Sequence, residues 1–332
     1  MGRNVSIVIV NYRTARMVVD CLAGIEAAAQ CCAVHAIVLD NASEDGSLEF
    51  LTQTVAQQGW SHWVSVESLQ RNGGFAFGSN MGIRTALGQG DTVDYFMLLN
   101  PDTVPRPGAI DVLVNFMESH PEAGIAGSGL EDEHGTIQCS AHNSPSPLGE
   151  FEGAARLGIL SELLASYAVS RPMVDRAHQC DWVSGASLLV RGRVFEDVGL
   201  LDEGYFLYFE EVDFCMRARK AGWTVWFVPE SRVIHHEGAA TGIREPRQRR
   251  PQYWYDSRRR YFVKHFGLSG LLLADTLFLL GRASLALRRF FHLGRGGLQQ
   301  DPSWFAFDLI AGDLRAFFMG DVFRIMREAP GQ

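Results

Sequence analysis

Short apolar runs alternate with longer amphipathic segments over the first 130 residues. Residues 5–10 (VSIVIV) form a β-branched run, and residues 15–29 place apolar side chains at helical spacing. The same alternation predicts further strands at 35–39, 63–67, 95–99 and 124–127, and helices that end near residue 58, begin within 71–80 and span 107–119. Strands joined by helical crossovers predict an α/β domain with a mostly parallel sheet.

The most informative stretch is Tyr95-Phe96-Met97-Leu98-Leu99-Asn100-Pro101-Asp102. Its large apolar side chains predict a strand buried on both faces, which ends at the proline. Asp102 then lies just beyond the carboxyl end of the strand, at the edge where open parallel sheets bind ligands. Two interpretations stay open: a turn residue that satisfies its own backbone, or a carboxylate that holds a divalent cation on a phosphate.

Residues 71–80 (RNGGFAFGSN) lead into a predicted helix. Glycines let a backbone approach a ligand closely, and a helix N-terminus attracts phosphate. Glycines before a helix are more often only a turn, however, and the segment is not a GxGxxG. Alone it is a weak indication of phosphate binding.

The second half adds acids and histidines to this pattern. Residues 206–217 (FLYFEEVDFCMR) predict a helix with three carboxylates near its beginning. The helix dipole favours acids there without any chemistry; alternatively, one carboxylate is a general base and the next anchors the loop. Strands are predicted at 181–191 and 224–228, and a mobile insertion or lid at 130–150. His235 and His236 then follow; one is a candidate metal ligand, although a surface histidine is the default.

Composition indicates a globular protein, with 47% apolar residues in a chain of 332. The six cysteines form no C-x-x-C pair, so we expect buried thiols in a reducing cytoplasm rather than a zinc site or disulfides. No charged leader with an apolar region precedes the first strand, so a secretory signal is not expected.

The net charge of −8 is distributed unevenly. Between Arg244 and Arg295 lie twelve Arg or Lys and three acidic residues, interleaved with aromatic residues and followed by leucines. This pattern fits a segment on a membrane surface, a packed helix with a solvated basic face, or, with less support, a nucleic-acid surface. Residues 267–281 are too short to span a bilayer and include Asp275, so a transmembrane helix is not expected.

Together the motifs resemble a known family. In order, the chain carries NYR, LDNASEDGS, RNGGFAFGSN, LLNPD, VSGASLLV, LDEGYFLYFEEVDFCMRARKAGW and IHHEG. This set is similar to family 2 glycosyltransferases with the GT-A fold, and within them to bacterial rhamnosyltransferases of cell-wall and O-antigen synthesis. The resemblance implies a Rossmann-like, mixed but mostly parallel sheet flanked by helices. It implies a catalytic domain at 1–240, with a nucleotide-sugar half (about 1–127) and an acceptor half (about 128–240), and a basic, aromatic helical region at 241–332.

The resemblance also assigns donor-binding residues. Asp40 matches the acid that accepts a hydrogen bond from the pyrimidine, Tyr12 lies against the base, and Arg71 reaches the nucleotide. Asn100-Pro101-Asp102 stands where the family carries its DxD signature, with asparagine in place of the first acid. The implied donor set is Tyr12, Asp40, Arg71, Asn72, Gly73, Gly74, Asn100 and Asp102.

A divalent cation, Mg²⁺ or Mn²⁺, is the implied cofactor. Asp102 alone would make the anionic contact to the ion that bridges it to the diphosphate. His235 matches a histidine after the last core strand and is the expected second ligand, whose nitrogen favours Mn²⁺; His236 is the less favoured of the two.

Glu211 aligns with the family's catalytic base, which is more often an aspartate. Glu210 is the alternative, and Asp213 completes the expected catalytic group. The implied reaction is a single inverting displacement, in which the base takes a proton from the attacking acceptor hydroxyl. Trp182, Ser184 and Gly185 are expected on the sugar and acceptor side, although core packing explains Trp182 equally well.

The implied donor is dTDP-L-rhamnose, and the implied acceptor is lipid-linked or a polysaccharide. The expected location is the cytoplasm, peripherally on the cytoplasmic face of the inner membrane, with no nucleic-acid partner and with a homodimer left open. One rival is the same chemistry with UDP-GlcNAc or UDP-galactofuranose. Another is a catalytically silent nucleotide-binding subunit of a polysaccharide assembly complex. A sugar-nucleotide pyrophosphorylase is disfavoured, because Asn11-Tyr12-Arg13 is not a glycine-rich loop.

Overall fold

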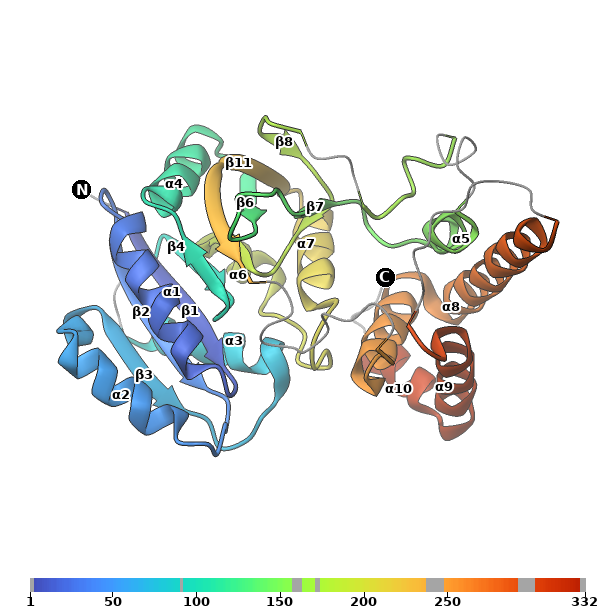
Figure 1. Ribbon diagram of the computed structural model, residues 1–332, viewed down its shortest axis with the longest axis horizontal. Coiled ribbons are helices and arrows are strands. Elements are labelled where there is room, and N and C mark those ends of the chain that lie inside the picture. The colour runs from blue at the N-terminus through green and yellow to red at the C-terminus, as the bar shows by residue number, and fades with distance from the viewer. Residues whose placement is uncertain are drawn as a thin grey trace. The chain divides into compact units, whose positions relative to one another are not determined.

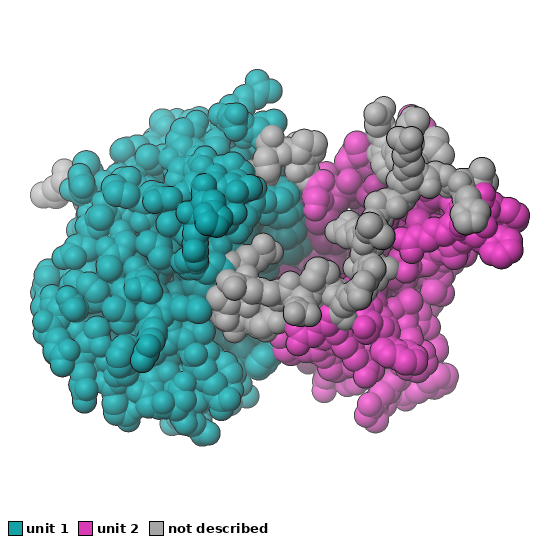
Figure 2. Space-filling model, in the orientation of Figure 1, with its two compact units in different colours: residues 1–142, 172–206, 210–244 teal, residues 143–171, 207–209, 245–332 magenta. Residues whose placement is uncertain are grey.

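The computed structural model describes residues 3–89, 92–156, 163–170, 174–236, 248–291 and 302–328. The chain forms two compact units, coloured separately in Figure 2. Unit 1 comprises residues 1–142, 172–206 and 210–244, and unit 2 comprises residues 143–171, 207–209 and 245–332. The domain boundary expected near residue 240 falls outside the described residues and stays a prediction.

Unit 1 is an α/β unit built as the hydrophobic pattern predicts (Figure 1). Its elements are β1 (Asn4–Asn11), α1 (Ala15–Ala28), β2 (Ala33–Asp40), α2 (Ser47–Gln57), a short 3₁₀ helix (Trp60–His62), β3 (Val64–Ser68), α3 (Gly74–Gly88), β4 (Tyr95–Leu99), β5 (Thr103–Pro105), α4 (Ala109–Ser119), β6 (Ala123–Glu131), β7 (Ala141–His142), β8 (His178–Gln179), β9 (Trp182–Val183), β10 (Ser187–Arg191), α6 (Gly192–Val198), α7 (Glu210–Lys220) and β11 (Thr224–His235).

The main sheet has the strand order β3-β2-β1-β4-β10-β6-β11-β5, and β8 pairs with β11. Strands β1 to β4 pair in parallel, as do β6 and β11, whereas β10 runs antiparallel between β4 and β6. This is the expected mixed, mostly parallel sheet. Because side chains alternate between the faces of a strand, β1 supplies both apolar layers. Helices α1, α2 and α4 cover one face, and α3, α6 and α7 cover the other.

The candidate site lies at one edge of this sheet. Strands β1, β2 and β4 are parallel, so their carboxyl ends meet there, at Asn11, Asp40 and Leu99. Antiparallel β10 begins at the same edge, with Ser187 paired to Leu99. Strand β11 ends there too, because His235 pairs with Thr103 of β5.

Unit 2 contains α5 (Pro147–Ala155), α8 (Gln252–Phe290), α9 (Phe305–Met319) and α10 (Asp321–Glu328). This confirms the expected helical C-terminal region. Helix α8 departs from helical backbone angles at Gly267, whose φ is 70°. Its buried Arg258 forms ion pairs with Glu150, Asp275 and Asp313. Within unit 2 these pairs tie α8 to α5 and α9.

By length and composition alone, one segment of α8 is apolar enough to cross a membrane, and 33% of that segment is buried inside the structure. A packed helix of a protein without membrane spans passes the same test. The expectation that no transmembrane helix exists therefore stays a prediction.

Two sequence-based expectations were wrong in part. The lid expected at 130–150 includes the end of β6, strand β7 and the start of α5, whose N-cap Ser146 accepts a hydrogen bond from the Gly149 backbone N–H. The six cysteines are free thiols, but they are not all buried: Cys31 and Cys139 are exposed. Both lie next to loops, where composition does not predict burial.

Candidate active site

Asp40 is held rigidly at the end of β2. It is buried and accepts hydrogen bonds from Asn11 Nδ2 (2.7 Å), the Ser43 hydroxyl (2.5 Å) and the Ser43 backbone N–H (3.2 Å). Two of these bonds go to Oδ1, which leaves Oδ2 with the single long bond to the Ser43 backbone. A carboxylate oxygen accepts more than one bond, so Oδ2 retains capacity for a ligand N–H.

The glycine loop before α3 is tied to the end of β2 by Asn41. The Asn41 side chain donates to Asn72 Oδ1 and to the Gly74 carbonyl, and it accepts from the Gly73 backbone N–H. Gly74 has a φ of 86°, and a Cβ there would lie 2.0 Å from the Phe206 carbonyl oxygen. Phe75 also donates its backbone N–H to that oxygen. The close approach of the Phe206 backbone therefore explains why position 74 is a glycine.

Tyr12 and Arg71 lie beside these loops. Tyr12 directly follows β1, is 39% exposed and has the Arg13 guanidinium 5.1 Å from its ring centre. The Arg71 guanidinium lies 4.9 Å from the centre of the Phe77 ring. Both expected donor residues therefore belong to loops at the site's edge of the sheet.

Asp102 and His235, the two expected metal ligands, lie close together. Their Oδ1 and Nε2 atoms are 3.7 Å apart, and Asp102 is buried. The turn is fixed by the Asn100 carbonyl, which accepts hydrogen bonds from the Thr103 hydroxyl and backbone N–H. His236 instead directs Nδ1 at Glu133, at 2.8 Å. The structure therefore places the side chain of His235 beside the Asp102 carboxylate, whereas His236 contacts Asp102 through its backbone, whose N–H donates to the Asp102 carbonyl.

Gln138 orients the His235 ring. Gln138 Oε1 lies 3.2 Å from His235 Nδ1, and Gln138 Nε2 donates to the His235 carbonyl. If Nδ1 carries the proton and donates it to Gln138, the Nε2 lone pair faces Asp102. An outer hydrogen bond of this kind is how proteins commonly fix a metal-binding histidine.

The pair fits a divalent cation held jointly with a ligand. Among the described residues no group of three or more His, Cys, Asp or Glu forms a complete metal cage. A carboxylate oxygen and an imidazole nitrogen suit Mn²⁺, and Mg²⁺ is commonly held by one or two carboxylates together with substrate phosphates. Asp102 and His235 therefore supply a partial site that a diphosphate would complete.

Two adjacent buried carboxyls begin α7. Oε2 of Glu210 and Oε2 of Glu211 are both buried, without a hydrogen-bond partner in the described part of the chain. Burial raises the pKa of Glu211 to about 7. Burial, together with the neighbouring charge of Glu211, raises the pKa of Glu210 well above its usual range. Such a site suits a general base that works near neutral pH.

The acceptor-side segment lies against Glu211. A methyl group on Gly185 would lie 3.6 Å from Glu211 Cβ and 3.9 Å from its carboxyl carbon. Trp182 stacks on His142, with ring centres 4.1 Å apart. Ser184 accepts the Ala186 backbone N–H, which shapes the turn into β10. Of the three expected acceptor-side residues, Gly185 lies directly against Glu211.

Asp213 has a different environment. It is fully buried, and its Oδ2 accepts from Arg217 Nε at 2.8 Å. Arg217 also donates to the carbonyls of Val198 and Leu200. This geometry favours an anchor for the preceding loop over a proton acceptor.

The sequence model of the family described as "Glycosyltransferase like family 2" matches residues 3–254. The chain belongs to glycosyltransferase family 2. The N-acetylglucosaminyl-diphospho-decaprenol L-rhamnosyltransferase of Mycobacterium tuberculosis is 30% identical over 230 residues, which are 64% of this chain and 69% of the relative. The rhamnosyltransferase WbbL of Escherichia coli is 28% identical over 143 residues, 43% and 52% of the two chains.

Solved structures agree on the fold of this family 2 glycosyltransferase. Staphylococcus aureus TarS 1–349 aligns with 97% of this chain and 81% of that one, at a TM-score of 0.53 and 12% identity. The mannosyltransferase PcManGT from Pyrobaculum calidifontis, in complex with GDP-Man and Mn²⁺, aligns with 98% of this chain and 84% of that one. The TM-score is 0.52 and the sequence identity is 14%. These likenesses confirm the expected GT-A fold class.

Sequence reasoning about this family 2 enzyme did not find several supporting side chains. Asn11, Asn41 and Ser43 organise the Asp40 loop, and Gln138 orients His235. Asn41 and Ser43 lie inside the LDNASEDGS segment, so their position near Asp40 was a usable signal. Gln138 lies 97 residues from His235 in sequence, and no pattern connects them.

Proposed function

We propose that this enzyme transfers L-rhamnose from dTDP-L-rhamnose to a hydroxyl of a lipid-linked acceptor. The observation that carries the proposal is that the Asp102–His235 pair lies at the sheet edge where β10 begins, and that the Glu211 carboxyl lies against Gly185, just before β10. The names of the two rhamnosyltransferase relatives support L-rhamnose as the transferred sugar. The Mycobacterium tuberculosis relative, named for a diphospho-decaprenol acceptor, supports the lipid-linked acceptor over a free polysaccharide.

Donor binding divides among the loops at this edge. Asp40 Oδ2 accepts an N–H of the pyrimidine, and the exposed Tyr12 ring lies against the base. Arg71 and the loop of Asn72, Gly73 and Gly74 adjoin the nucleotide, and Asn100 shapes the turn that presents Asp102. The close approach of Gly74 to Phe206 supports a positioning role for this loop.

Asp102 and His235 would hold the divalent cation, either Mg²⁺ or Mn²⁺. When bound, the ion supplies electrostatic stabilisation of the departing diphosphate. Asn100 replaces the first acid of the DxD signature, so the protein contributes one negative charge, and we expect the donor diphosphate to strengthen ion binding.

Glu211 acts as the general base. Its carboxylate takes the proton of the acceptor hydroxyl while the hydroxyl oxygen attacks the anomeric carbon and the bond to the diphosphate oxygen breaks. The attack comes from the opposite face, so the anomeric configuration inverts. Glu210, whose pKa is raised further by the charge of Glu211, stays protonated, and Asp213 anchors the loop through Arg217. Trp182, Ser184 and Gly185 form the acceptor side.

The enzyme works peripherally on the cytoplasmic face of the membrane in this proposal, and a homodimer stays open. Unit 2 exposes many large apolar side chains, among them Leu272, Leu280 and Phe290 of α8, Phe318 of α9 and Trp304 just before α9. Large exposed apolar patches mark interaction surfaces. Near basic residues they favour a membrane, where a lipid-linked acceptor resides.

A donor screen tests this function. The purified enzyme is incubated with a short-chain prenyl-diphosphate GlcNAc acceptor, Mn²⁺ or Mg²⁺, and one of dTDP-L-rhamnose, UDP-GlcNAc or UDP-galactofuranose. Mass spectrometry of the acceptor should show addition of a deoxyhexose only with dTDP-L-rhamnose. Addition of another sugar would replace the donor assignment. No transfer or hydrolysis of any donor would favour the silent nucleotide-binding subunit.

A further inference from the structure

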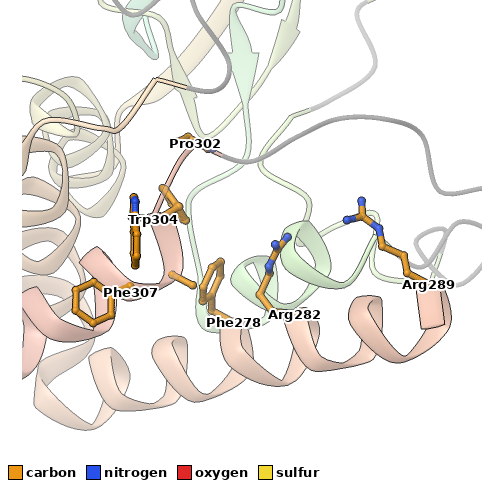
Figure 3. A pocket seen from close by; sticks show the side chains of 8 residues that line it. Phe278, Arg282, Arg289, Pro302, Trp304 and Phe307 are labelled. Carbon is orange, nitrogen blue, oxygen red and sulfur yellow. The ribbon is translucent and has the colours of Figure 1, made fainter.

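A pocket of about 400 Å³ opens within unit 2, far along the chain from the site residues. Its lining includes Phe278, Arg282 and Arg289 of α8 and Pro302, Trp304 and Phe307 at the start of α9 (Figure 3). Arg282 and Arg289 are seven residues apart, close to two helical turns, so both side chains extend from the same side of α8. Phe278 belongs to the core of unit 2 and closes one part of the pocket.

The side chains that line this pocket suit a ligand that carries a negative charge next to apolar groups. Within the part of the chain that the structure describes, two guanidinium groups and several aromatic side chains line the pocket, without an acidic side chain. Guanidinium groups bind phosphate oxygens bidentately. The adjacent Arg288 donates to the carbonyl of Arg156 at 3.2 Å and is not among the lining residues.

The rim of the pocket indicates which phosphate it takes. Trp304 is 67% and Phe307 62% exposed, and next to Arg289 the side chain of Phe290 is 77% exposed. A water-soluble phosphate would leave these rings in water. A membrane would bury them, since tryptophan with arginine is the usual combination at the interface between lipid and water.

We propose that this pocket binds the phosphate of an anionic phospholipid, held by Arg282 and Arg289 while Trp304 and Phe307 enter the lipid interface. The proposal deepens the membrane association in the proposed function by naming its ligand. It needs neither sugar donor nor acceptor, so vesicle binding and sugar transfer fail independently.

Vesicle flotation of the full-length protein tests this pocket. The probes are vesicles of phosphatidylcholine alone, with phosphatidylglycerol, or with a prenyl diphosphate. Binding should require phosphatidylglycerol. In the double variant Arg282→Gln/Arg289→Gln the partition constant should fall roughly 25-fold, because each arginine near an anionic surface contributes a factor of about five. Arg315→Gln/Arg324→Gln removes the same charge from exposed positions outside the pocket and should lose clearly less.

Two further variants distinguish a loss of binding in the pocket from a loss caused by misfolding. Arg282→Lys/Arg289→Lys keeps the charge but loses bidentate geometry, so it should bind more weakly than wild type. Trp304→Ser should also weaken binding. Equal losses in the pocket and control pairs, or no loss in the lysine pair, would assign binding to diffuse charge and overturn the pocket. Binding only to vesicles with prenyl diphosphate would overturn the phospholipid assignment.

Discussion

At the residue scale, the geometry of the Asp102–His235 pair depends on Gln138, which contacts the Nδ1 side of the histidine ring and the His235 carbonyl. A ring held by one hydrogen bond on Nδ1 presents Nε2 in a constant direction. Without that bond the ring can rotate, and the distance of 3.7 Å between Nε2 and Asp102 Oδ1 is no longer maintained.

The substitution Gln138→Leu should therefore weaken metal binding without abolishing it. Loss of an outer partner of a metal ligand typically reduces affinity about 10-fold to 100-fold. The Mn²⁺ concentration for half-maximal transfer should rise by that factor, while kcat at saturating Mn²⁺ changes less. His236→Gln is the matched control, because His236 directs Nδ1 at Glu133. A rise of equal size in both variants would exclude the orienting role of Gln138.

At the element scale, the loop before α3 is shaped by close packing as well as by ligand binding. Gly74 takes a left-handed φ and leaves no room for a Cβ against Phe206. Gly46 at the start of α2 has nearly the same φ, 85°, with nothing within 4 Å of its Cβ position. Comparing substitutions at the two positions therefore distinguishes the cost of backbone strain from the cost of steric overlap.

Gly46→Ala should cost only the left-handed backbone strain, about 1 kcal/mol in the free energy of unfolding. Gly74→Ala adds the overlap with the Phe206 carbonyl and should cost about 3 kcal/mol or more. Urea denaturation measures both. Gly74→Ala should also weaken dTDP binding, whereas Gly46→Ala should not. Equal destabilisation would show that Phe206 moves aside freely.

The sequence predicted most elements of unit 1, because buried strands and amphipathic helices have distinct periodicities. The single strand expected at 181–191 was wrong in part, since β9 and β10 are separate strands in different sheets. It placed Asp102 and His235 together through motif order, which resemblance supplied. It missed β5, the three-residue strand whose pairing puts His235 opposite Thr103, since so short an apolar run carries no periodicity. It missed Gln138 because that contact is set by tertiary register. It also missed α5, because a proline-rich segment predicts a loop although Pro147 starts the helix.

At the scale of the whole molecule, several buried carboxyls make stability depend on pH. Burial raises the pKa of Glu211 and of Asp275 to about 7, and Glu210 shifts in the same direction. The folded protein therefore keeps protons that the unfolded chain releases above about pH 4 to 4.5. The stability they contribute is fully present below that pH and is lost as pH rises through about 7.

Thermal unfolding should consequently show a higher Tm at pH 5.5 than at pH 8. The double variant Glu210→Gln/Glu211→Gln removes two of these groups and leaves Asp275 and Asp313, whose pKa values burial also raises. Its Tm should exceed that of wild type at pH 8 and change less with pH. Wild type and variant should converge near pH 5, where both glutamates are protonated. A wild-type Tm that rises steadily from pH 5.5 to 8 would contradict the burial of these carboxyls.

The role of Glu211 is tested by the rate of sugar transfer in the variant Glu211→Gln, measured beside dTDP binding in the same preparation. Glutamine keeps the size of the side chain and removes the base. With Mn²⁺ and dTDP-L-rhamnose, kcat should fall about 10²-fold to 10⁴-fold, while stabilisation by dTDP with Mn²⁺ stays equal to that of wild type. The wild-type rate should also rise with pH through about 7, where Glu211 ionises. Transfer by Glu211→Gln within a few fold of wild type would contradict the role of Glu211 as the base.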